Sequence, residues 1–316
     1  MESQQPSVFS HLSESGAFLA PASHEQTRLW YLWQENTADT SYNMAYKLCV
    51  NGKLNLEAVE QALVSLQERH EVLRTSFVIE QGNVKQLVHP KGEIHLEYFS
   101  LDGQVLDDQL LDGKVQSAST NTASKLVEDI AGAPFDLSSL PLMRCRLIRF
   151  GPEESWLVFA MHHIIGDGWS HAVLTRDFCA YYNRALSHGD DDAQLPELEM
   201  QYSDFAEWQK ASATDQKLKD DRERWVEKIN DVPELRLPNC HEEGREDSLG
   251  VERFTLDISQ VSALKVVVRE QNLTISALYL SAFQQTLATI SNQKEFLMGM
   301  VVANRELAEL DNLIGF

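Results

Sequence analysis

The chain has 316 residues, of which 43% are hydrophobic and 24% are charged, as is ordinary for a globular protein. This length allows two domains or lobes. The formal net charge of −21 argues against a nucleic acid or an anionic membrane as a partner, because both attract positively charged surfaces. We see no signal peptide and no apolar run of membrane-spanning length, so we expect a cytoplasmic protein with no nucleic-acid or membrane partner.

The four cysteines are far apart in the sequence and form no CxxC pair. Three of them lie in apolar segments, which is typical of buried thiols. We therefore expect free thiols in a reducing compartment at Cys49, Cys145, Cys179 and Cys240.

Regular hydrophobic spacing begins after residues 1–18, which are polar and which we expect to form a flexible tail. A helix should begin at Ser23, because Gln26 three residues later completes a capping box. Asn55 is placed to cap a second helix. Alternation of apolar residues predicts strands over 44–50, 77–79, 84–88, 94–99 and 142–150. One helix is expected among them, at 123–131.

Residues 69–77 place two arginines, a histidine and a glutamate among apolar residues. Charges taken out of water cost several kcal/mol each unless they are paired. We therefore expect Arg69 and Arg74 to form ion pairs with residues elsewhere in the fold.

A turn at 151–154 should fold the strand at 142–150 back onto the next strand as an antiparallel pair. A helix is then expected from about 170 to 188, followed by an acidic loop that marks a lobe boundary at 190/191. Beyond that boundary the pattern predicts helices at 202–225, 258–271 and 274–290 and two short strands at 254–256 and 295–302.

The apolar strand from Trp156 ends in two histidines, His162 and His163, and a turn containing Asp167 and Gly168 leads into the next helix. Ligand sites favour such strand ends in α/β sheets. Neighbouring strand residues point to opposite faces, so one histidine should be structural while the other faces a cavity.

Three interpretations of this stretch remain open on the residues alone. The histidines can be satisfied core residues beside a turn aspartate. They can be metal ligands together with Asp167, although their opposed directions disfavour this. One histidine can serve acyl transfer as a base or a positioning group, with Asp167 orienting the site.

The stretch from His162 to Gly168 reads HHIIGDG and resembles the HHxxxDG motif of nonribosomal peptide synthetase condensation domains. Other segments resemble further motifs of this family in the expected order. They are SHEQTRLW at 23–30, RHEVLRTSF at 69–77, PFDL at 134–137 with Pro141 and Leu142, YSDFAEWQ at 202–209, and NLIGF at 312–316.

The resemblance implies an α/β chloramphenicol-acetyltransferase-like fold with two lobes, each an α+β sandwich. We expect a flexible tail at 1–18, a complete N-terminal lobe at 19–190 and a partial C-terminal lobe at 191–316. On this basis the chain alone should be inactive or poorly stable. The early start of the motifs after Met1 predicts that the domain opens its polypeptide and receives its donor in trans.

The resemblance also implies the activity. Donor and acceptor peptidyl carrier proteins would present phosphopantetheine thioesters, and the acceptor amine would attack the donor thioester to form an amide. No cofactor would be bound directly, and an adenylation domain would be adjacent. An ordinary condensing domain with an L-accepting donor site fits better than a cyclising or an epimerising one.

The family assigns the chemistry to the second histidine, here His163, as a base or as a positioner of the amine. His162 and Asp167 would be structural, and Asp167 would pair with Arg74. Gly168 would allow close approach to the thioester and help to polarise its carbonyl. Arg69 and Trp208 would support the site.

Two other function classes remain. One is a standalone O-acyltransferase that uses a coenzyme A thioester and shares the HHxxxDG motif. The other is a non-catalytic module that docks carrier proteins. The match at 69–77 and 202–209 argues against the first, and the intact His163, Asp167 and Arg74 argue against the second.

Overall fold

The computed structural model describes residues 16–101, 114–115, 120–187, 195–212, 215–238, 252, 254–303, 305 and 307–316. The chain forms two compact units, which are described separately. The first contains residues up to 214 together with 303–316, and the second contains 215–302. The expected lobe boundary at 190/191 stays a prediction, as does the tail over 1–18, most of which lies outside the described residues.

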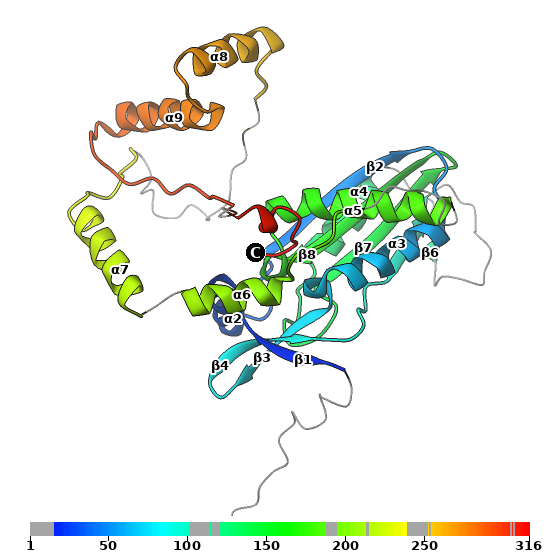
Figure 1. The fold of residues 1–316 in the computed structure, drawn as a ribbon. Coiled ribbons are helices and arrows are strands. Elements are labelled where there is room, and N and C mark those ends of the chain that lie inside the picture. The colour runs from blue at the N-terminus through cyan, green and yellow to red at the C-terminus, as the bar shows by residue number, and fades with distance from the viewer. Residues whose placement is uncertain are drawn as a thin grey trace, which may run out of the picture. The chain divides into compact units, whose positions relative to one another are not determined.

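A five-stranded sheet forms the centre of the first unit (Figure 1). Its strands, in spatial order, are β2 (Asn43–Asn51), β8 (Glu154–His162), β7 (Met143–Gly151), β5 (Leu96–Ser100) and β6 (Lys114–Val115). β7 and β8 pair antiparallel across the predicted turn, whereas β5 runs parallel to β7. The predicted hairpin is therefore confirmed, and β8 lies inside the sheet, between β2 and β7.

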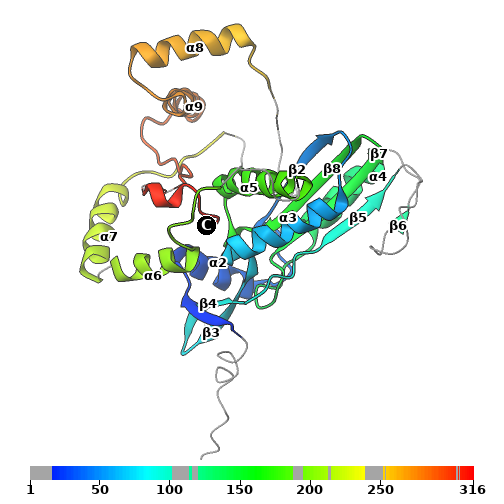
Figure 2. The ribbon, with the colours of Figure 1, turned by 45° about the vertical axis from the view of Figure 1, so that its right-hand side comes forward.

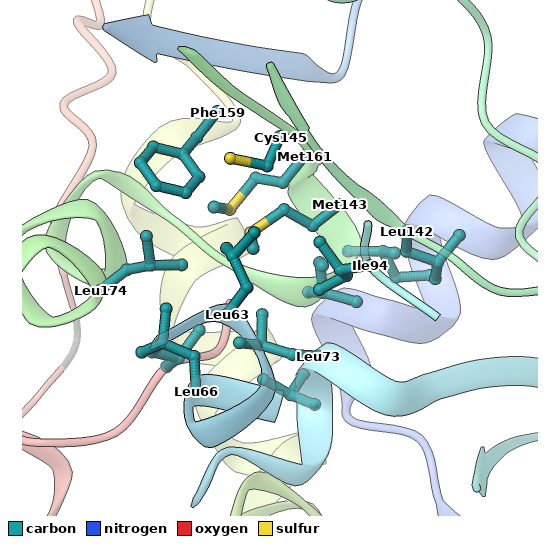
Figure 3. Packing of buried hydrophobic residues seen from close by; sticks show 14 of the residues in the cluster. Leu63, Leu66, Leu73, Ile94, Leu142, Met143, Cys145, Phe159, Met161 and Leu174 are labelled. Atoms are coloured by element: carbon teal, nitrogen blue, oxygen red, sulfur yellow. The ribbon is translucent and has the colours of Figure 1, made fainter. Parts of the chain in front are cut away.

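Helices cover both faces of this sheet because its strands alternate two sets of apolar side chains. Leu157, Phe159 and Met161 face α3 (Leu56–Arg69) and α5 (Gly168–Leu186), which pack side by side (Figure 2). Figure 3 shows this core, in which Leu63 and Leu66 of α3 meet Leu174 of α5 and the sheet. Val158 and Ala160 face α4 (Thr120–Gly132) on the other side.

A smaller sheet lies beside the large one, with strand order β1 (Phe18–Pro21), β4 (Asn83–Val88) and β3 (Thr75–Glu80). α2 (His24–Glu35) follows β1 directly, and the predicted capping box is confirmed, since Ser23 and Gln26 bond reciprocally. α6 (Tyr202–Ser212) packs against β1. The 3-10 turn η2 (Glu71–Arg74) connects α3 to β3.

The second unit contains three helices among its described residues, namely α7 (Asp215–Ile229), α8 (Ile258–Glu270) and α9 (Ile275–Ser291). The helical pattern over 202–225 is thus divided between α6 and α7. The strands predicted at 254–256 and 295–302 are wrong, because neither segment forms a sheet in the described structure. A strand needs a neighbour for its backbone groups, and none is paired with them here.

The described helices include none with both the length and the apolar character needed to cross a membrane.

Candidate active site

A tight turn joins β8 to α5 and carries the two histidines. β8 ends at His162, a 3-10 turn η3 spans His163–Ile165, and α5 begins at Gly168. Asp167 caps α5, because its carboxylate accepts hydrogen bonds from the Ser170 amide at 2.8 Å and the Ser170 hydroxyl at 2.6 Å. The turn is compact: a Cβ on Gly166 would lie 2.9 Å from the sulfur of Met161, so only glycine fits without displacement.

His162 is a buried structural residue, with 3% of its surface exposed. Its Nδ1 accepts a hydrogen bond from the Ile164 amide at 3.1 Å, which holds the start of η3. Burial and the neighbouring His163 lower the pKa of His162 to about 4. This imidazole is therefore neutral at physiological pH and its lone pair is engaged by the backbone.

His163 lies in different surroundings from His162. Its backbone N–H donates to the Tyr42 carbonyl at 2.8 Å, and its ring meets the ring of Phe316 edge to face, with centroids 4.5 Å apart. Nδ1 is buried and has no hydrogen-bond partner among the described residues. Packing, rather than a hydrogen bond at Nδ1, therefore sets the orientation of this imidazole.

The partner of Asp167 is Arg305, whose guanidinium lies 3.3 Å from the carboxylate. Arg305 also donates to the carbonyls of Leu313 at 2.7 Å and Gly315 at 3.1 Å. The expected pairing of Asp167 with Arg74 is wrong. Arg74 lies at the end of η2, where it pairs with Glu71 at 3.3 Å and donates to backbone carbonyls of Gln67 and His89.

Asp177, in the middle of α5, is the partner of Arg69 and His70 from the segment 69–77. Its side chain is fully buried and accepts from Arg69 Nε at 2.9 Å and from Arg176 at 2.7 Å, and it pairs with His70 Nε2 at 2.8 Å. Burial would raise the pKa of Asp177, but hydrogen bonds from His70 and Arg176 outweigh it and lower the pKa. The prediction that this segment forms long-range ion pairs is confirmed for Arg69.

Sequence reasoning missed both Arg305 and Asp177. Arg305 follows Asp167 by 138 positions, and nothing in its own segment distinguishes it from a surface arginine. Asp177 offered a weak signal, since a single acidic residue lies between Leu174 and Phe178 on the apolar side of α5.

Gly168 and Trp208, two further predicted site residues, are not tightly packed. A Cβ on Gly168 would meet nothing within 4 Å, and no left-handed backbone requires glycine there. Trp208 on α6 is half-exposed and contacts the ring of Phe205, with centroids 6.0 Å apart. Packing within the described structure explains neither residue.

Hydrogen bonds connect five of the family-like segments, 23–30, 69–77, 162–168, 202–209 and 312–316. Gln26 donates to the Ile164 carbonyl at 3.2 Å, and Gln209 accepts from the His24 amide at 2.9 Å. Ser203 donates to Glu71 at 3.2 Å. The amide of Gly315 donates to the Ser170 hydroxyl, just after the turn, at 3.1 Å. Segments nearly 300 residues apart in the sequence thus join in one network that includes this turn.

The described side chains do not gather three or more histidines, cysteines or carboxylates into a group that could hold a metal ion. His162 and Asp167 are instead occupied by Ile164, Ser170 and Arg305.

The fold and this turn define an α/β protein of the chloramphenicol-acetyltransferase-like type, as predicted. A condensation domain of the monacolin K polyketide synthase MokA superposes with a TM-score of 0.75 at 19% identity, over 95% of this chain and 66% of that one. The first condensation domain of the calcium-dependent antibiotic synthetase gives a TM-score of 0.76 at 15% identity, over 94% and 66%. These structures show the fold.

The sequence shows the family. The Condensation domain family model matches residues 18–316, so the chain belongs to the condensation domain family. It is 32% identical over 302 residues to chondramide synthase cmdD of Chondromyces crocatus, and 34% identical over 299 residues to phosphinothricin tripeptide synthetase PhsC of Streptomyces viridochromogenes. These alignments cover 95% and 94% of this chain but 7% and 26% of the relatives.

Proposed function

We propose that the protein catalyses amide-bond formation between a donor acyl or peptidyl thioester and the amine of an acceptor aminoacyl thioester. The observation that carries this proposal is the network of hydrogen bonds that joins the family motifs at 23–30, 69–77, 202–209 and 312–316 to one another and to the turn that holds His163. One relative is a tripeptide synthetase, and the family resemblance implies that the thioesters are held on phosphopantetheine arms. The partners are therefore a donor and an acceptor peptidyl carrier protein, with an adenylation domain in the same assembly.

The reaction joins the acceptor nitrogen to the donor carbonyl carbon and breaks the C–S bond, so that the donor thiol leaves and the amine loses a proton. Nδ1 of His163 is shielded from solvent, so Nε2 is the nitrogen that faces the substrate. Nε2 accepts the amine proton or a hydrogen bond that aligns the amine for attack. His162 takes no proton in this scheme, since its Nδ1 holds the Ile164 amide.

The start of α5 supplies the electrophilic side of the site. The first amides of a helix have no intrahelical acceptor, and the helix dipole makes this end positive. Asp167 occupies the Ser170 amide, which leaves the amide of Gly168 to polarise the thioester carbonyl. The open space around Gly168 allows the thioester to approach the backbone. Asp167, Arg69 and Trp208 support this arrangement without contacting the reacting atoms.

The proposal places the reaction in the cytoplasm, where thiols such as the buried Cys145 stay reduced.

His163→Ala tests the assignment directly, with a donor thioester and an acceptor thioester loaded on two carrier proteins. Loss of a general base or positioner should reduce the rate of amide formation by about 10²- to 10⁴-fold, as followed by mass spectrometry. His95→Ala is the matched control, because His95 is exposed immediately before β5, and it should retain full activity. Unchanged product with His163→Ala would remove the assignment. Turnover of a coenzyme A donor with an alcohol, in place of carrier-bound substrates, would indicate an O-acyltransferase instead.

A further inference from the structure

Tyr202, the first residue of α6, is buried with 3% of its surface exposed, and the reaction as proposed gives it no role. Its hydroxyl lies 3.1 Å from the Ser23 hydroxyl and donates to the Phe316 carbonyl. Burial raises the pKa of this phenol above its ordinary value, so the proton stays in place. Tyr202 therefore connects the start of α2 to residue 316.

The direction of these hydrogen bonds follows from the donors available. A carbonyl can only accept, so the single Tyr202 proton goes to Phe316. The Ser23 proton then goes to the Tyr202 oxygen, while the Ser23 oxygen accepts from the Gln26 amide at 3.1 Å. The result is a directed chain from the α2 N-terminus to the Phe316 carbonyl, in which each hydroxyl both donates and accepts.

The ring of Tyr202 fixes the same segment by packing. A Cβ on Gly315 would lie 1.9 Å from the Tyr202 ring, so glycine is required at this contact. On its other side the Gly315 amide donates to the Ser170 hydroxyl at 3.1 Å, and the Gly315 carbonyl accepts from Arg305 at 3.1 Å. Residues 315 and 316 are thus clamped between the first turns of α5 and α6.

Phe316, which is held in this way, contacts His163. Its ring meets the imidazole with centroids 4.5 Å apart and planes at 67°. The usual device for orienting a working histidine is a hydrogen bond at the second ring nitrogen. Nδ1 of His163 has no such bond within the described structure. Packing against the Phe316 ring therefore orients the imidazole and its Nε2.

We propose that Tyr202 is a positioning residue for the condensation reaction. It acts through Phe316 on the orientation of His163, and it touches neither substrate. This inference rests on the proposed function, because it takes His163 as the group that meets the amine.

Tyr202→Phe is the test, because it removes only the hydroxyl and keeps the ring against Gly315. Small misplacements of a reacting group cost one to two orders of magnitude in rate. We expect kcat for amide formation to fall by about tenfold, with KM for both loaded carriers within about twofold. Tyr182→Phe is the matched control, because the Tyr182 hydroxyl also bonds to the backbone: near the other end of α5 it accepts from the Asn55 amide at 3.0 Å. It should leave kcat unchanged.

Two further measurements separate positioning from a loss of stability. The ring NMR signals of His163, identified by their absence in His163→Ala, should shift in Tyr202→Phe and not in Tyr182→Phe. In the double variant Tyr202→Phe/His163→Ala, activity should equal that of His163→Ala alone, because both changes act on one group.

The outcomes distinguish this inference from the proposed function. Equal kcat in Tyr202→Phe and Tyr182→Phe, or an unmoved His163 signal, would overturn the positioning role while amide formation remains. A tenfold loss that also appears on top of His163→Ala would show that Tyr202 acts by another route and would overturn it as well. Full activity of His163→Ala would instead remove the proposed function on which the inference rests.

Discussion

The two units of this chain differ in how their side chains find partners. In the first, residues far apart in the sequence meet: Arg69 with Asp177, Asp167 with Arg305, and Ser23 with Tyr202. In the second, neither α8 nor α9 has a buried residue, and most side-chain bonds join neighbours in the chain. The first unit therefore depends on tertiary contacts, whereas the described part of the second depends mainly on local helix-forming signals.

Similar chemical groups occur in both units, which allows matched substitutions. An ion pair, a glycine and an apolar side chain should each be sensitive to substitution where they are buried, in the first unit, and tolerant where they are exposed, in the second. The expectations below run from the largest difference to the smallest.

Asp177→Asn should destabilise the protein by about 3 kcal/mol, because it leaves the largely buried guanidinium of Arg69 without a counter-charge. Asp221→Asn removes the exposed pair with Arg224 on α7 and should cost less than about 0.5 kcal/mol. Urea denaturation at pH 7 measures both. A cost below about 1 kcal/mol for Asp177→Asn would mean that the first unit does not depend on this network.

Acidification should weaken the first unit through His162. Its pKa is about 4 in the folded protein and about 6.5 when unfolded, so the unfolded state binds more protons between these values. The stability that depends on a neutral His162 is therefore fully present above pH 6.5. As the pH falls towards 4, the free energy of unfolding decreases by up to about 3 kcal/mol. The measurement is the free energy of unfolding at pH 7 and pH 5 for the parent and for His162→Asn.

His162→Asn keeps an acceptor for the Ile164 amide but has no titrating group. Its unfolding free energy should therefore change less between pH 7 and pH 5 than that of the parent. Identical pH dependence in the two proteins would contradict the burial argument and would assign the acid sensitivity to other groups, such as the buried His70, whose pKa burial also lowers.

Gly315→Ala should cost about 1–3 kcal/mol, because the new methyl group overlaps the Tyr202 ring and the surrounding core must move. Gly299→Ala in the second unit is the matched control, because a Cβ there meets nothing within 4 Å. It should be neutral. Thermal unfolding of the two variants checks the difference, and equal melting temperatures would show that residue 315 is not clamped as described.

Val301→Ser should change stability by less than about 0.5 kcal/mol, because 98% of its surface is exposed. The same measurement sharpens the contrast between the units. A loss above about 1 kcal/mol would show that the segment 295–302 is covered in solution, and that the second unit also depends on tertiary contacts.

Local signals in the sequence predicted most of the first unit. The capping box at Ser23, the hairpin at 151–154 and the core strand ending at His162 are fixed by residues within a few positions of one another. The two wrong strands, at 254–256 and 295–302, lie where an apolar alternation is present but no paired neighbour exists. An alternating pattern shows which side chains a strand could bury. The strand forms only if a neighbouring strand pairs with its backbone.

By itself, the sequence determined the fold class, the helix caps, the order of the motifs and the candidate histidine. Periodicity and capping act over a few residues and can be read directly from the chain. Only the tertiary structure decided which ions pair. It assigned Asp167 to Arg305 instead of Arg74, gave Arg69 to Asp177, and placed Phe316 against His163. Such pairs depend on where distant segments meet, and no local spacing records that.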